Sequence, residues 1–357
     1  MNAPRASGYF RTSYAQDLQV LETRTRKVSF VLFAVGLLAL PFLFGAFALD
    51  LANQVLLAVI GAAALMLLTG YAGQISLGHA GLLAAGAFTT GILFKEFGAP
   101  FWITLPASAL VGAALGLIFG LPSLRLRGLY LAVSTLALHF IVIHLGSEYE
   151  TRRGFSTGVV IDAPRLFGWE LADARAWYYV LLGAAAGTLL VSLNLLRTRT
   201  GRAWRAIHVR ETVAGALGIS VQGAKLSAFV VSSTLTAVAG SLFAYYRGFV
   251  SAEAFSLFLT IQYVAMVIIG GMGSLLGAVC GAVFVVLFPY AIESGIKAAL
   301  PPALLPDSSV FFAANYAAFG LVMILFLVFE PMGLVGIWKR AQNWVLLWPF
   351  KQKPLGK

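Results

Sequence analysis

Residues 51–81 read LANQVLLAVIGAAALMLLTGYAGQISLGHAG, and this stretch decides the fold. Its first part, residues 51–69, is long and apolar enough for an α-helix that crosses a bilayer, which takes about 20 residues. Its second part, residues 70–81, combines glycines with polar side chains, and each glycine lowers helix propensity by up to about 1 kcal/mol relative to alanine. The stretch therefore predicts a membrane helix followed by an irregular segment.

The composition of the whole chain is that of a membrane protein, since 60% of its 357 residues are hydrophobic and only 11% are charged. Apolar segments of helical length lie at residues 29–49, 51–69, 82–94, 101–120, 128–145, 177–196, 226–248, 259–270, 275–292 and 311–329. We expect an all-α integral membrane protein, a polytopic helical bundle of about ten transmembrane helices with a range of roughly 8 to 11. The third and eighth segments are short enough to be broken or partly re-entrant elements.

The positions of the basic residues along the chain indicate which segments face the cytoplasm. Of 25 Lys and Arg residues, 18 lie in the N-terminal segment, the short loop at 121–127, residues 197–225 and the tail. Such residues are retained in the cytoplasm, and ten helices place all four segments on one face. We therefore expect cytoplasmic segments at 1–28 and 337–357, a transmembrane domain at 29–336, a cytoplasmic loop at 197–225 and an outer-face loop at 146–176. The net charge of +11 then reflects membrane topology, so we expect membrane lipid and not nucleic acid as a partner.

The sequence contains no motif for catalysis or for a resident cofactor. It has no GxxxxGK[ST] phosphate loop, no GxSxG, no HExxH and only one cysteine, and its four histidines are scattered. We therefore expect neither an enzyme nor a metal site. Charges within the predicted spans are almost absent, which weakens an ion-coupled secondary carrier without excluding it. If the protein transports a solute against its concentration gradient, the energy comes from a partner and not from this chain.

Two glycine-rich breaks interrupt the apolar segments. The first contains Gly70, Gly73, Gln74, Ser76, Gly78, His79 and Gly81, and the second contains Gly270, Gly271, Gly273 and Ser274. Each is either a tight cytoplasmic turn, where glycine lets helices approach closely, or an unwound element that lines a translocation path. Composition favours the turn. Glycines also recur at a spacing of four in residues 112–120 and 273–281, which predicts close helix packing, within the chain or between subunits.

The basic loop at 197–225 reads RTRTGRAWRAIHVRETVAGALGISVQGAK. Its pattern predicts a short amphipathic helix that ends at Gly218. Trp204, Ile207 and Glu211 follow the i, i+3, i+7 spacing of one helix face. The helix therefore presents a knob to a cytosolic partner, or lies on anionic lipid.

Four separated motifs resemble the permeases of branched-chain amino acid ABC importers, in particular those of the LivM type. They are GYAGQISLGHAG at 70–81, GLYLAVSTLA at 128–137, GRAWRAIHVRETVAGALGIS at 201–220 and QYVAMVIIGGMGS at 262–274. The resemblance runs from about residue 52 to residue 334. It implies a permease domain at 29–336 with a cytoplasmic coupling helix.

The resemblance also implies partners and a location. A second permease of the LivH type, two cytosolic ATP-binding-cassette subunits of the LivG and LivF types that use ATP and Mg²⁺, and a periplasmic binding protein complete such an importer in the bacterial inner membrane. The implied cargo is a branched-chain amino acid. Urea or short-amide importers use permeases of the same family and remain an alternative, as does an ion-coupled carrier.

The candidate coupling residues are Arg202, Trp204, Ile207, Glu211, Ala214, Gly215 and Gly218. Of these, Glu211, Ala214 and Gly218 match the coupling-helix signature that sits in a cleft of the ATPase. The chain departs from the family pattern at Gly215, where a second alanine is common, and at residues 208–210, where a more acidic or polar run is usual. The resemblance therefore implies the role of the loop and leaves its docking register open.

Overall fold

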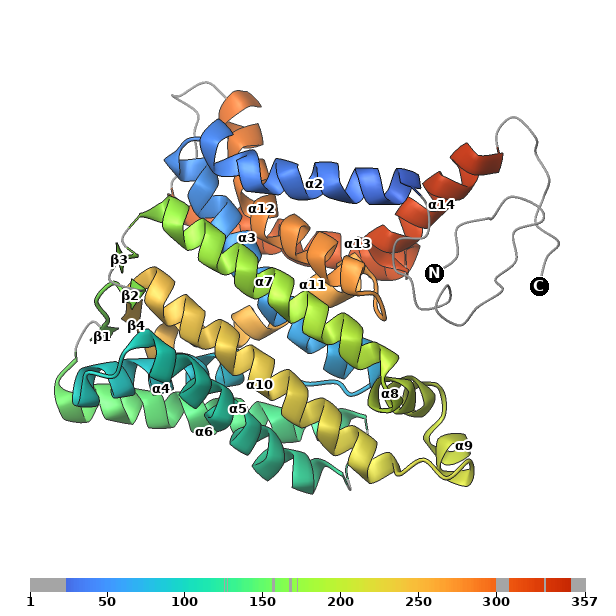
Figure 1. The fold of residues 1–357 in the computed structure, drawn as a ribbon, viewed down its shortest axis with the longest axis horizontal. Coiled ribbons are helices and arrows are strands. Elements are labelled where there is room, and N and C mark those ends of the chain that lie inside the picture. Colours follow the sequence, from blue (N-terminus) through green and yellow to red (C-terminus); the bar gives the residue numbers. More distant parts are fainter. Residues whose placement is uncertain are drawn as a thin grey trace.

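The computed structural model describes residues 24–124, 126, 128–155, 158–166, 169–171, 173–299, 308–330 and 332–347. These residues form a bundle of helices, in which the long helices α7 (Ala174–Arg197) and α10 (Val221–Arg247) run in nearly the same direction (Figure 1). Most of the N-terminal segment at 1–28, the two arginines of the loop at 121–127 and the end of the tail lie outside the described residues.

Helices account for nearly all of the described chain. They are α2 (Arg24–Leu43), α3 (Ala46–Leu65), the π-helix η1 (Met66–Tyr71), α4 (His79–Phe97), α5 (Phe101–Ser123), α6 (Leu129–Arg153), α7 (Ala174–Arg197), α8 (Arg199–Val209), α9 (Glu211–Ala216), α10 (Val221–Arg247), the 3-10 helix η2 (Ala252–Phe255), α11 (Leu257–Gly270), α12 (Leu275–Ala299), α13 (Ser308–Phe329) and α14 (Gly333–Leu347). Each predicted helix has a counterpart, so the all-α polytopic prediction is confirmed. The helix α14 in the predicted tail was not expected.

Within the described residues, fewer than ten helices have the length and hydropathy of a membrane span. Six described helices are long and apolar enough, at Ala46–Tyr71, Phe101–Pro122, Tyr130–Arg153, Ala174–Arg197, Val221–Arg247 and Leu275–Lys297. The pair α13 and α14, bent by 52°, makes a seventh if it counts as one span. The helix α11 has 14 residues and rises only about 21 Å. The helix α4 is continuous and not broken, but Lys95 and Glu96 lower its hydropathy.

The predicted outer-face loop at 146–176 is shorter in the structure and contains three short strands. The helix α6 continues to Arg153, stabilised by an ion pair between Arg152 and Glu148 with an N–O distance of 2.7 Å, and ends at Gly154 with a φ of +70°. The strand β1 (Val159–Val160) pairs with β4 (Phe249–Val250), and β2 (Arg165–Leu166) pairs with β3 (Trp169–Glu170), both antiparallel. The β1–β4 pair ties this loop to the end of α10.

The glycine stripes pack helices within the chain. A Cβ atom on Gly112 of α5 would lie 2.5 Å from the Ala237 Cβ of α10, and one on Gly116 would lie 2.9 Å from the Ser233 Cβ. In the second stripe, a Cβ atom on Gly281 of α12 would overlap the carbonyl oxygen of Met266 in α11. Because no side chain fits at these contacts, the stripes serve internal helix pairs.

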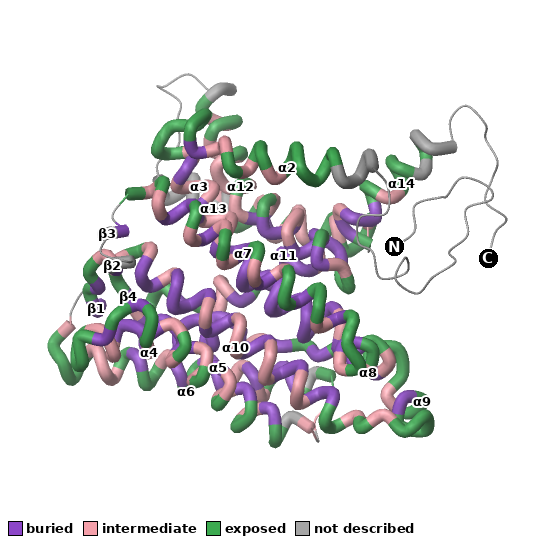
Figure 2. The backbone as a smooth tube through the Cα atoms, viewed as in Figure 1, coloured by how far each residue is buried: buried purple, intermediate pink, exposed green. Residues whose placement is uncertain are grey.

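Burial divides the bundle into central and peripheral helices (Figure 2). Within its most apolar window α3 is 72% buried and α10 is 56% buried, against 28% for α5 and α7. The helix α2 exposes Phe30, Leu32 and Phe33, the apolar surface expected of a helix that faces lipid. The helices α3 and α10 are therefore the central helices of the bundle.

Candidate functional site

The basic loop at 197–225 folds into the short helices α8 and α9 at one end of the bundle, which we call the tip end (Figure 1). The helix α8 buries Gly201, Trp204 and Ile207. The Trp204 indole is fully buried, and its Nε1 donates a hydrogen bond of 3.0 Å to the Ser227 hydroxyl of α10. The helix α8 is thereby fixed to the body of the protein.

The prediction of one continuous helix in this loop is wrong. Arg210 has an extended backbone, with φ −158° and ψ 111°, which separates α8 from α9. Glu211 therefore lies on a second helix and shares no face with Trp204 and Ile207. Those two side chains also point into the protein, so the apolar face of α8 packs on neither lipid nor a cytosolic partner. Arg202 is exposed and donates to the carbonyl of Arg197 at 3.0 Å.

The helix α9 is held by a partly buried ion pair. The Lys225 Nζ lies 2.6 Å from the Glu211 Oε1, and only 6% of the Lys225 side chain is exposed. Ala214 is buried beneath the helix, and Gly218 ends it with a φ of +81°, as predicted. Gly215 is exposed, and a Cβ atom there would meet only Val221, at 3.8 Å. An alanine would fit at this position.

Three large apolar side chains stand out from the tip end. Val209 is 78% exposed, Val213 is 49% exposed and Leu217 is 76% exposed. We call these residues the tip surface. Sequence reasoning missed them because it assigned the contact face to Trp204 and Ile207. The available signal was the spacing of four residues between Val213 and Leu217, which places both on one side of α9.

The first glycine-rich break is a buried return segment and not a tight turn. Residues 72–78 are non-helical, and Gln74, Ser76 and His79 are only 3%, 2% and 1% exposed. The ring of Tyr263 in α11 packs on Gly61 of α3 and lies 4.7 Å from the His79 ring. Since Gly61 precedes Tyr71 by ten residues, the return segment runs back along α3 by about 15 Å. The helix α4 therefore begins inside the bundle.

Side chains from neighbouring helices bind the backbone of this break. The Leu77 N–H donates to the Thr135 hydroxyl at 2.9 Å, and the Ala80 N–H donates to the Thr260 hydroxyl at 3.0 Å. The Ser76 hydroxyl accepts from the Gly78 N–H at 3.3 Å. Gly78 and Gly81 lie against Thr135 and His139 of α6, too close for a side chain. These bonds explain how a non-helical segment is tolerated at this depth.

Two polar side chains of the break have buried atoms without a hydrogen-bond partner. Among the described residues, neither amide atom of Gln74 has a hydrogen-bond partner, and neither does the Nε2 of His79. A buried polar group without a partner costs about 1–3 kcal/mol. Gln74 and His79 therefore place polar atoms that can still form hydrogen bonds in the apolar interior of the bundle.

The structure brings the two glycine-rich breaks and the basic loop together. A Cβ atom on Gly73 would lie 2.8 Å from the His208 Nδ1 of α8. The Arg205 guanidinium lies over the Tyr71 ring, 5.5 Å from its centroid. A Cβ atom on Gly70 would lie 2.9 Å from the Gly273 amide nitrogen. These segments are far apart in sequence, and their contact was not predicted.

The second break joins α11 to α12. Gly271 and Gly273 have φ values of +113° and +76°, which glycine adopts without strain. Gly270 lies against the Gly277 carbonyl oxygen, and the Ser274 hydroxyl accepts from the Gly277 N–H at 3.3 Å. This break is a compact turn, the reading that composition favoured for both. In the described part of the chain, no group of three His, Cys, Asp or Glu residues could hold a metal ion.

Comparisons with known proteins agree with the motifs. The family model described as "Branched-chain amino acid transport system / permease component" matches residues 47–328. The high-affinity branched-chain amino acid transport system permease protein LivM of Escherichia coli K12 is 32% identical over 332 residues, covering 85% of this chain and 74% of that protein. The LivM protein of Salmonella typhimurium is 31% identical over 344 residues, covering 89% and 77%.

A more distant relative is a permease of the LivH type. The probable branched-chain amino acid transport permease protein LivH of Methanocaldococcus jannaschii is 26% identical over 279 residues, covering 72% of this chain and 82% of that protein. Among solved structures, none matches the chain. The resemblance stated from the four motifs is therefore confirmed by alignments that extend over most of the chain.

Proposed function

Because the chain belongs to the family of permease components of branched-chain amino acid transport systems, we propose that it is the LivM-type permease subunit of an ATP-binding-cassette importer. In this proposal a periplasmic binding protein delivers branched-chain or related hydrophobic amino acids, and partner ATPases supply the energy. The chain is a multi-pass membrane protein of a transport system. We further propose a bacterial inner membrane location with both termini in the cytoplasm.

The observation that carries the proposal is the tip surface on a rigidly anchored loop. Val209, Val213 and Leu217 are exposed among the arginines of the loop, whereas Trp204 is fully buried. Exposed apolar side chains on a loop that we propose to be cytoplasmic suit insertion into a cleft of a partner protein. We propose that one of two cytosolic subunits, which are of the LivG and LivF types, docks here, and that both subunits bind ATP and Mg²⁺ themselves.

Contacts of α8 offer a route for motion from the tip surface into the membrane. The anchor Trp204 joins α8 to α10, and His208 and Arg205 touch the end of η1 beside the return segment. A shift of the loop by an ATPase would therefore move α8 with α10 and press on Gly73. We propose that this movement, together with a second permease of the LivH type, alternates access to a path that Gln74 and His79 line.

The docking proposal can be tested by placing a charge on the tip surface. Leu217→Asp should abolish co-purification of the ATPase subunits with the permease, because the buried interface would then hold an unpaired carboxylate. Val160→Asp is the matched control, since Val160 is also exposed, 55%, but lies in β1 at the opposite end. Equal recovery of ATPases with both variants would refute the docking assignment.

The energy source needs a separate measurement. Liposomes that contain the complete importer should accumulate leucine only when ATP is supplied on the side of the tip surface. Liposomes that contain this chain without ATPase subunits should not accumulate it. Ion-driven uptake by the chain alone would favour a secondary carrier and contradict the importer.

A further inference from the structure

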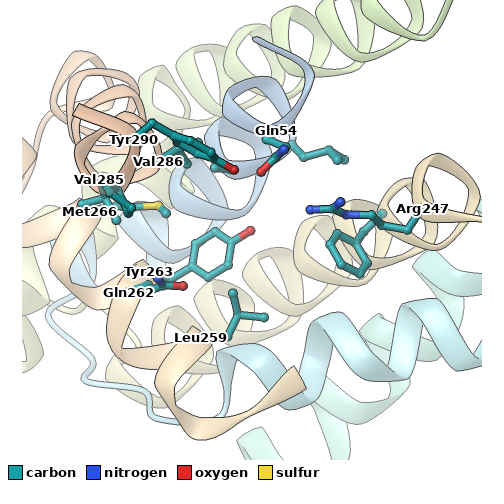
Figure 3. A pocket seen from close by; sticks show the side chains of 13 residues that line it. Gln54, Arg247, Leu259, Gln262, Tyr263, Met266, Val285, Val286 and Tyr290 are labelled. Atoms are coloured by element: carbon teal, nitrogen blue, oxygen red, sulfur yellow. The ribbon is translucent and has the colours of Figure 1, made fainter. Parts of the chain in front are cut away.

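A cavity of about 300 Å³ lies at the end of the bundle opposite to the tip surface, between α3, α10, α11 and α12 (Figure 3). Its volume is at the lower limit of the range for small-molecule sites, about 300–1,000 Å³. One wall is apolar and includes Leu57, Leu259, Met266 and Val286. We call this space the end cavity.

The position of the end cavity follows from the helices that line it. Arg247 is the last residue of α10 and precedes β4, which pairs with the loop strand β1. Gln54 lies in the first half of α3 and Leu259 near the start of α11. The first turn of α10 lies beside the basic loop, about 40 Å away along a helix of 27 residues. The end cavity and the tip surface therefore lie on opposite sides of the bundle.

Four polar side chains direct their ends into this space. Figure 3 shows the Arg247 guanidinium, the Gln54 amide and the hydroxyls of Tyr263 and Tyr290 converging on it. Tyr263 is 7% exposed, and its hydroxyl forms no hydrogen bond with any described residue. Because this hydroxyl points into the end cavity, it can form a hydrogen bond with a polar ligand there.

Of the described residues that line the end cavity, only Arg247 carries a charge. Arg247 is exposed, lies over the Phe243 ring with a distance of 5.8 Å to its centroid, and forms no ion pair with any described residue. The nearby carboxylate of Asp50 accepts hydrogen bonds from the Tyr246 hydroxyl and from the Gln54 Nε2, the latter at 2.7 Å. Since Gln54 donates with its nitrogen to Asp50, its Oε1 remains as an acceptor for the cavity.

We propose that the end cavity is a binding subsite for an α-amino acid with an aliphatic side chain, which rests on the proposed importer function. The Arg247 guanidinium binds the carboxylate, because its planar fork matches the two oxygens. The Gln54 Oε1 accepts from the α-ammonium group, and the Tyr263 hydroxyl donates to the carboxylate. The aliphatic side chain lies on Leu259, Met266 and Val286.

A site of this kind would hold the solute weakly after its delivery. Transport requires binding that is favourable enough for entry and weak enough for release. The one charged contact selects molecules with a carboxylate, whereas the apolar wall selects against hydrophilic side chains. Urea has no carboxylate, so this subsite distinguishes an amino acid from a short amide.

Leucine uptake into liposomes that contain the complete importer tests the charged contact. Arg247→Gln should lower the uptake rate at least about tenfold, because it removes a charge-assisted hydrogen bond. Arg247→Lys, which keeps the charge without the fork, should fall between this variant and the wild type. The control is Arg175→Gln, since Arg175 is also exposed near this end, at the start of α7, but does not line the end cavity. It should transport at the wild-type rate.

A second pair of variants tests the apolar wall. Val286→Trp fills the end cavity and should lower leucine uptake, whereas Val283→Trp changes an exposed residue of the same helix outside the cavity and should not. ATP hydrolysis by the assembled complexes verifies that each variant folds and binds its ATPases. Equal uptake by Val286→Trp and Val283→Trp would contradict the proposal.

Thiol labelling gives a direct readout of occupancy. In a Cys280→Ser background, Val286→Cys should react with a membrane-impermeant thiol reagent, and millimolar leucine should slow the reaction, whereas isoamylamine, which lacks the carboxylate, should not. If the wild-type importer takes up no branched-chain amino acid, the proposed function fails. If it takes up leucine while Arg247→Gln retains full uptake and leucine gives no protection, only the end-cavity proposal fails.

Discussion

The two ends of α10 carry opposite arrangements of apolar and polar side chains. At the tip end, Leu217 and Val213 of the basic loop are exposed, and Trp204 is buried against α10. At the other end, the polar groups of Arg247 and Tyr263 point inward to a cavity with an apolar wall. Outward apolar groups suit a protein surface and inward polar groups suit a small solute. The same helix therefore connects two kinds of recognition.

The largest change should come from Gly240→Leu, because it damages both ends at once. A Cβ atom at Gly240 of α10 would overlap the Leu83 carbonyl oxygen of α4, and a backbone carbonyl cannot move aside as a side chain can. We expect a loss of about 3 kcal/mol or more in unfolding free energy. Intrinsic-fluorescence unfolding in detergent measures it. Gly187→Leu in α7, where no atom lies within 4 Å, is the control and should be nearly neutral.

The next largest effect should come from Trp204→Ala, which should disrupt the structure of the tip end and leave the end cavity intact. Removing a fully buried tryptophan costs about 3–5 kcal/mol, here from the docking of α8 on α10. We expect loss of ATPase co-purification, while leucine still protects Val286→Cys at the end cavity. Arg202→Ala, an exposed neighbour on α8, should retain the ATPases. Loss of leucine protection in Trp204→Ala would show that the two ends are not separable.

A smaller effect is expected from Lys225→Met, which removes the ion pair that positions α9. The pair is partly buried, so its loss should cost about 1–3 kcal/mol locally, less than a fully buried pair. Leucine uptake per ATP hydrolysed measures the consequence and should fall. The exchanged pair Lys225→Glu with Glu211→Lys should recover part of the coupling. A wild-type ratio in Lys225→Met would mean that the position of α9 does not depend on this pair.

The smallest effect should come from Gly215→Ala, which tests whether α9 is helical at the tip end. The added methyl group fits and improves helix propensity by up to about 1 kcal/mol. Backbone amides of α9 should therefore exchange with solvent more slowly, by up to about fivefold. Gly218→Ala should have the opposite effect, since its φ of +81° is strained for alanine. Faster exchange in Gly215→Ala would mean that α9 is not helical in the importer.

Local signals in the sequence were sufficient for the helices and their ends. The apolar length of residues 51–69 and the glycine at 218 each act through a short-range cause, which is hydrophobic thickness or a positive φ. The break at Arg210 has no such signal, because neither glycine nor proline stands there. An amphipathic pattern also does not say what covers its apolar face. Trp204 was therefore assigned to a partner, although it packs on the chain itself.

Contacts between remote segments could not be predicted from one sequence. The return segment was interpreted as a turn because composition reports flexibility and not depth. Its burial depends on Thr135 and Thr260, which lie in other helices. The end cavity likewise combines Gln54, Arg247 and Tyr263 from three helices, and no spacing along the chain relates them. Only the packing of α3, α10 and α11 places these side chains together.

The separation of an internal anchor from an exposed surface has an evolutionary consequence. Val209, Val213 and Leu217 contribute little to the chain's own stability because they are exposed, whereas Trp204 is embedded in it. Substitutions on the tip surface can therefore accumulate in step with changes in a partner without lowering the yield of folded permease. A loop built in this way is exchangeable between relatives, provided that the buried tryptophan and its serine are kept.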